Sequence, residues 1–125
     1  MESIYKHEKL QIKKFEESII YQELMRVAIE RVFQCKIIVG DMLPEYLKHA
    51  KLQNARILTI EIHIEDKPLI DYDGGIYQAF TDLSYITKKG KVKLFDWEQD
   101  EEFLSDLKEL ILLIKNGNYH TDNFS

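Results

Sequence analysis

The sequence predicts an α+β fold, with an antiparallel sheet of three to five strands, two N-terminal helices and one C-terminal helix. Near both ends of the chain, apolar residues recur at three- and four-residue steps, the spacing of helices that bury one face. Between about residues 56 and 97 they alternate with polar residues, as in strands exposed on one side. Strands gathered in one block favour an antiparallel sheet, because parallel strands need helical crossovers between them.

The composition indicates one globular domain. The 125 residues fit a single domain, which we expect over 1–117, with a short polar C-terminal tail over 118–125. A hydrophobic content of 45% argues against disorder. The N-terminus lacks the apolar stretch of a secretory signal, and no apolar run approaches the length of a membrane span, so we expect a cytoplasmic protein. Its single cysteine, Cys35, cannot form an internal disulfide and is expected to be a small buried residue.

Two helices are predicted in the first half of the chain. The first runs from about Lys9 to Gln34 and contains neither glycine nor proline. The apolar run 37–39 that follows fits either the last turn of that helix or a brief strand. Asp41 is a suitable cap for a second helix that continues to about Leu52.

The middle of the chain reads as strands. The clearest is Arg56 to Ile64, where four apolar residues alternate with polar ones. Turn residues at 65–68 let the chain return as a short strand over 69–72. The stretch 76–83 fits both helical and strand spacing, and strand is favoured. Two strands, 84–87 and 92–97, are expected to form a hairpin.

The last helix has signals at both ends. Asp100 or a neighbour can cap it, and acidic residues fill its first turn, where the helix dipole favours negative charge. Asn116 and Gly117 supply a stop signal. Its buried stripe is predicted to contain Phe103, Leu107, Leu110, Ile111 and Ile114.

The chain contains no established catalytic motif, and we expect a protein that is not an enzyme and needs neither cofactor nor metal. Glu61, His63 and Glu65 alternate onto one strand face, where they could shuttle protons or bind a metal, but an ordinary polar strand face explains them as well. Asp71 and Asp73, next to two glycines, could hold a cation, although a simple turn is favoured.

Charge is distributed unevenly along the chain. Residues 57–87 and 98–125 each carry a net charge of −5, and they flank a basic hairpin, residues 88–97, of net charge +3. The only tryptophan, Trp97, lies among five carboxylates. Packing of Trp97 in the core at a strand end is favoured, and an aromatic anchor in an acidic contact surface is the close alternative. The predicted partner-binding residues are Asp71, Tyr72, Asp73, Trp97, Glu98, Asp100, Glu101 and Glu102.

These features predict an acidic, non-enzymatic protein-binding domain. Its partner is expected to be a basic protein, and the favoured role is that of an immunity or antitoxin-type inhibitor that occludes the active site of a nuclease-like toxin. Two alternatives come from other classes. One is a nucleic-acid-binding module that uses Lys88 to Lys93, and the other is a small hydrolase built around His63.

Overall fold

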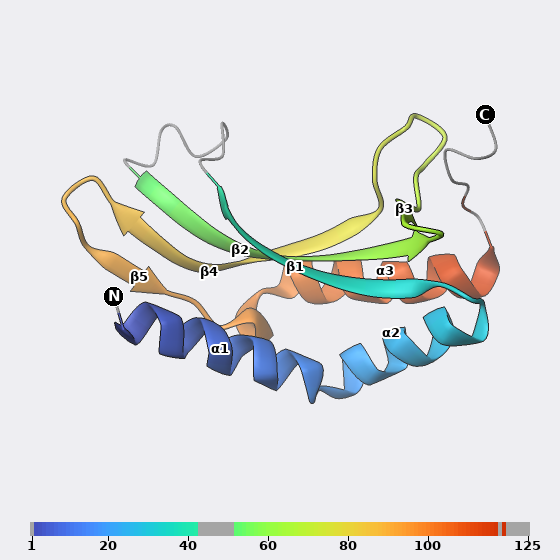
Figure 1. Cartoon of the computed structure of the whole chain (residues 1–125), viewed down its shortest axis with the longest axis horizontal. Helices are drawn as coiled ribbons and strands as arrows, with labels where there is room; N and C mark the ends of the chain where they lie inside the picture. The colour runs from blue at the N-terminus through green and yellow to red at the C-terminus, as the bar shows by residue number, and fades with distance from the viewer. Residues whose placement is uncertain (1, 43–51, 118, 120–125) are drawn as a thin grey trace.

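The protein, described here from a computed structural model over residues 2–42, 52–117 and 119, folds into two layers. A five-stranded antiparallel sheet forms one layer, and all three α-helices pack on the same side of it (Figure 1). This arrangement confirms the predicted α+β class. The elements are α1 (Glu2–Glu16), α2 (Ile19–Glu30), β1 (Gln34–Met42), β2 (Leu52–Ile64), β3 (Lys67–Pro68), β4 (Gln78–Thr87), β5 (Val92–Leu94), the short 3-10 helix η2 (Trp97–Gln99) and α3 (Glu101–Asn116).

The first predicted helix is two helices. Ser18 separates α1 from α2: its hydroxyl donates to the Phe15 carbonyl at 2.6 Å and accepts from the Tyr21 amide at 3.2 Å. A serine whose hydroxyl accepts from a free amide in the first turn of a helix is a favoured N-cap. The helical spacing continues across the break, so periodicity alone does not reveal it.

Helix α2 ends at Glu30, four residues before the predicted end of the first helix at Gln34. After α2 the Phe33 amide donates to the Ala28 carbonyl at 2.7 Å and the Val32 amide to Ile29 at 3.0 Å. These two bonds form a Schellman motif, in which Val32 takes the left-handed position at φ 66°. The chain then enters β1, so the prediction of helix as far as Gln34 is wrong and the strand alternative for 37–39 is correct.

The helix predicted from Asp41 to Leu52 is wrong at both ends, because Asp41 belongs to β1 and Leu52 begins β2. Its middle, 43–51, lies outside the described residues, as does the predicted tail apart from Tyr119.

The sheet has the order β1-β2-β4-β5, and β3 pairs with the end of β2. Strand β2 confirms the predicted alternation: Leu58, Ile60 and Ile62 are fully buried towards the helices. Register shifts interrupt the β2–β4 ladder at two points, whereas the β1–β2 ladder is continuous over nine pairs.

The stretch 76–83 resolves largely as strand, because β4 begins at Gln78 and continues through Thr87. The hairpin from β4 to β5 is also confirmed, although β5 is shorter than predicted. The expected return strand at 69–72 is not formed: β3 ends at Pro68, and only an isolated bridge joins Ile70 to Ile76.

Helix α3 matches its prediction. Asp100 caps it by accepting from the Phe103 amide at 3.1 Å, and Gly117 ends it in the left-handed conformation at φ 73°. The five predicted stripe residues are all buried, and they pack between the sheet and α2. Among the described residues, no helix has the length and apolar character needed to cross a membrane.

Candidate protein-binding surface

Two adjoining hollows lie where the edge of β4 meets the start of α3. They have volumes of about 350 Å³ and about 340 Å³ and share Thr81, Asp82 and Asp100 in their walls. The described residues that line them include five carboxylic acids and no lysine, arginine or histidine. The acids are Asp82, Asp96, Asp100, Glu102 and Asp106. We call this region the acidic hollow.

Asp100 is engaged within the fold. One carboxylate oxygen caps α3, and the other accepts a hydrogen bond at 2.8 Å from the hydroxyl of Thr81 in β4. This residue therefore ties the helix to the sheet and supplies the floor of the acidic hollow.

Lys14 of α1 neutralises part of the acidic segment. Its ammonium lies 3.1 Å from both Asp96 and Glu98. Burial acts to raise the pKa of Asp96, but the Glu98 amide and Lys14 outweigh it, so the pKa lies below its ordinary value. Asp96 is thus stabilised as a charged group within the chain.

Asp82 is a carboxylate whose charged form the fold disfavours. Its Oδ1 atom is buried and has no hydrogen-bond partner among the described residues. Burial raises the pKa of Asp82 above its ordinary value; a hydrogen bond from Tyr85 opposes this shift, and the charge of Asp100 adds to it. A buried acceptor left unpaired costs free energy, so the fold holds Asp82 in this wall at a cost in stability.

The other side chains that line the acidic hollow are exposed or partly exposed to solvent. Phe80 is 42% exposed, and Glu102 is also exposed while Asp106 is half-buried. An exposed aromatic ring beside carboxylates offers both apolar contact and charge to a basic partner. Phe80, Asp82 and Asp106 were not among the residues predicted from the sequence.

Trp97 does not belong to this surface, and the expectation of an exposed anchor is corrected. Its side chain is 3% exposed and packs edge-on against Phe15 with ring centroids 5.3 Å apart. Its indole nitrogen donates to the Gln11 carbonyl at 3.0 Å, and its amide donates to the Gln11 side chain at the same distance. Trp97 therefore fastens α1 to the start of η2.

The two predicted acidic segments lie on different sides of the sheet. The chain between β3 and β4, which carries Asp71, Tyr72 and Asp73, rises on the side away from the helices, whereas α3 lies beneath the sheet (Figure 1). Asp71 Oδ1 accepts from the amides of Asp73 at 2.9 Å and Gly75 at 2.8 Å, the pattern of an aspartate turn. Glu101 and Glu102, in contrast, are exposed in the first turn of α3.

The His63 group is only partly assembled. His63 Nε2 and Glu61 Oε1 lie 2.8 Å apart, with side chains 10% and 15% exposed, and His63 Nδ1 is buried without a partner among the described residues. Glu65 instead occupies a tight turn with positive φ at Glu65 and Asp66. Within the described part of the chain, no three His, Cys, Asp or Glu side chains are grouped so that they could hold a metal ion.

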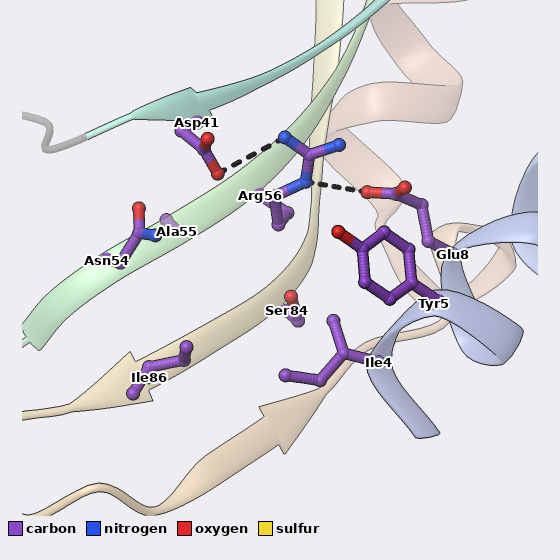
Figure 2. Close-up of a pocket in the computed structure, with 9 residues that line it drawn as sticks. All are labelled: Ile4, Tyr5, Glu8, Asp41, Asn54, Ala55, Arg56, Ser84 and Ile86. Atoms are coloured by element: carbon purple, nitrogen blue, oxygen red, sulfur yellow. Dashed lines mark hydrogen bonds and ion pairs between the residues drawn. The ribbon is translucent and has the colours of Figure 1, made fainter. Parts of the chain in front are cut away.

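A pocket of about 280 Å³ lies at the other end of the sheet, between the strands and the first turns of α1 (Figure 2). Arg56 occupies its centre and donates to Glu8 at 2.7 Å and to Asp41 at 3.1 Å. Since both carboxylates already bind Arg56, these charges serve chiefly to hold α1, β1 and β2 together. The pocket is lined by Ile4, Tyr5, Glu8, Asp41, Asn54, Ala55, Arg56, Ser84 and Ile86.

The four lysines of the β4–β5 hairpin are exposed. The tip is shaped by the Thr87 hydroxyl, which accepts from the Lys91 amide at 3.0 Å, and by Gly90 at φ 80°. The hairpin thus presents its lysines near the tip, while its last residues, Leu94 to Asp96, line the acidic hollow.

Comparison of the chain with protein-family models, with curated proteins and with solved structures finds no match.

Proposed function

We propose that this chain is an acidic protein-binding domain of the immunity or antitoxin type, which neutralises a basic, nuclease-like toxin in the cytoplasm. The observation that carries the proposal is the acidic hollow, where five carboxylic acids converge. Lys14 pairs with one of them, Asp96, and no cationic side chain lines the hollow itself among the described residues.

The chemistry of the hollow suits a basic side chain. A nuclease must bind phosphates and therefore presents arginine and lysine around its active site. Carboxylates can occupy the positions that phosphates would take and form charge-assisted hydrogen bonds with those cations. Asp82 adds a further carboxylate to the wall, and Phe80 supplies apolar contact at the rim. Inhibition by this route is occlusion and needs no catalysis.

The test is affinity capture of the tagged protein from its source cells at low and high salt, with bound proteins identified by mass spectrometry. The wild type is expected to retain a basic protein in stoichiometric amount, which high salt weakens because exposed charge pairs are screened. A hollow variant, Asp82→Asn with Glu102→Gln and Asp106→Asn, removes three charges with little change in shape. It is expected to bind that protein at least tenfold more weakly.

The matched control is Glu109→Gln, which removes one exposed charge from α3 outside the hollow. It is expected to bind like the wild type. Equal capture by the hollow variant would overturn the proposal, as would a partner that is not basic. Nucleic acid can also be captured with the tagged protein. If it is, and if changing Lys88, Lys89, Lys91 and Lys93 to Gln abolishes that capture, the result would instead support the hairpin alternative.

A further inference from the structure

Strand β1 is a long unpaired edge of the sheet. It spans nine residues, pairs with β2 on one side, and has no strand on its other side among the described residues. None of its described side chains is fully buried, and Ile38 is 43% exposed. An edge of this kind offers free backbone amides and carbonyls to another strand.

The usual devices that keep an edge strand unpaired are nearly absent from β1. Proteins block edges with proline, bulges, short strands or lysines. Here the ladder with β2 runs without a register shift, and the strand contains no proline. Its one lysine, Lys36, directs its ammonium to Asp66 at 3.4 Å.

The residues of β1 are arranged so that the strand can pair with itself. In an antiparallel pair related by a twofold axis through Ile38, Ile37 faces Val39 of the second copy, and Lys36 faces Gly40. Ile37 and Val39 pack against the core on the helix side, so this register extends the core from one copy into the next. No like charges face each other.

The register about Ile38 places neither Ile37 nor Ile38 opposite a charged side chain, whereas each neighbouring register does so. Sliding the pair by two residues in one direction places Ile37 opposite Asp41, and sliding it in the other places Lys36 opposite Ile38. A slip by one residue is excluded, because it would turn the core-facing side chains to the opposite face.

We infer that β1 is a homodimer interface, in which two copies pair antiparallel about Ile38 and form one continuous sheet. The acidic hollow lies at β4, on the other side of β2 from this edge. Dimerisation therefore leaves both hollows accessible, and its test is independent of the proposed function.

Cysteine cross-linking tests both the contact and the register. Directly opposed residues of an antiparallel pair have Cα atoms about 4.5–5.5 Å apart, within disulfide range. In a Cys35→Ala background, Ile38→Cys is expected to form a covalent dimer under mild oxidation. Lys36→Cys is the matched control: the two copies of residue 36 would lie about 14 Å apart along the strand and are expected to stay unlinked.

Sedimentation equilibrium measures the same contact without cross-linking. The wild type is expected to be a dimer, and Ile38→Lys to raise the dissociation constant by about tenfold or more, because two ammonium groups then face each other. Ile38 is part-exposed, so circular dichroism is expected to show an unchanged fold. A wild type that stays monomeric at 100-micromolar concentration overturns the inference. Cross-linking of Lys36→Cys in preference to Ile38→Cys overturns the register.

Discussion

Val32 holds a backbone conformation that β-branched residues rarely adopt. Its φ of 66° is the left-handed position of a Schellman motif, which glycine normally fills, and its side chain is 80% exposed. We expect Val32→Gly to stabilise the fold by about 1 kcal/mol, because the left-handed strain of a side chain is removed and little contact is lost. Thermal unfolding monitored by circular dichroism checks this.

Gln34→Gly is the control for Val32→Gly. Gln34 starts β1 in an ordinary extended conformation, where glycine only adds freedom to the unfolded chain. It is expected to lower the melting temperature. A Val32→Gly variant that is equally destabilised would show that the position carries no strain.

Individual site residues were predictable only where the local sequence decides their role. Asp100 was identified as a cap because its position follows from the helix that it begins. Phe80 and Asp82 were missed because their meeting with Asp106 depends on how α3 lies against β4, a contact between distant segments. Trp97 was named as a binding residue because of its acidic neighbours, but its ring packs in the core against α1, which is again a contact between distant segments.

Asp100 joins two elements, and its loss is expected to affect both. Asp100→Ala removes the α3 cap and leaves the Thr81 hydroxyl, in a residue 3% exposed, without its acceptor. We expect a destabilisation of about 2 kcal/mol, the sum typical of a lost cap and an unpaired buried group. Denaturant unfolding gives the value.

Two controls separate these contributions. Asp100→Asn keeps an acceptor for the helix amide and is expected to cost less than the alanine variant. Glu101→Ala changes an exposed neighbour in the same turn and is expected to lie within about 0.5 kcal/mol of the wild type. A loss of the same size in Glu101→Ala would mean that charge at the helix start, and not the cap, is what stabilises α3.

Elements were predictable where local signals agree. Helix α3 has a cap, an apolar stripe and a glycine stop, and its prediction is confirmed throughout. The α1–α2–β1 region has weaker boundary signals: a single serine cap marks the first break without glycine or proline, and a valine takes the glycine position at the second. Helical periodicity then overruns both boundaries, because tertiary packing decides where the helices stop.

At the scale of the whole molecule, the sheet separates its two candidate contact regions. Strand β1 forms one edge, and the acidic hollow lies beside β4, beyond β2. The fold class followed from the grouping of strands along the sequence, but this separation did not, since it depends on strand order. A dimer through β1 would present two acidic hollows on the outer parts of one sheet and could bind two copies of a basic partner.

The acidic hollow is expected to reduce the stability of the free protein. Burial raises the pKa of Asp82 in the folded state above its ordinary value of 3.8. The contribution of the Asp82 carboxyl to folding stability is therefore fully present below pH 3.8 and is lost as the pH rises through the pKa of the folded state. At neutral pH the wild type therefore carries an unfavourable charge that Asp82→Asn removes, and we expect the variant to be more stable by about 0.5–2 kcal/mol.

The pH dependence identifies the origin of that gain. The difference in melting temperature between Asp82→Asn and the wild type is expected to be largest near pH 7 and to shrink towards pH 3.8. At that pH the wild-type carboxyl of the folded protein becomes protonated and is then neutral, like the asparagine. A difference independent of pH would indicate a packing effect. Since the same substitution is part of the hollow variant that should lose the basic partner, stability and binding should change in opposite directions, as expected for a residue retained for function at a cost in stability.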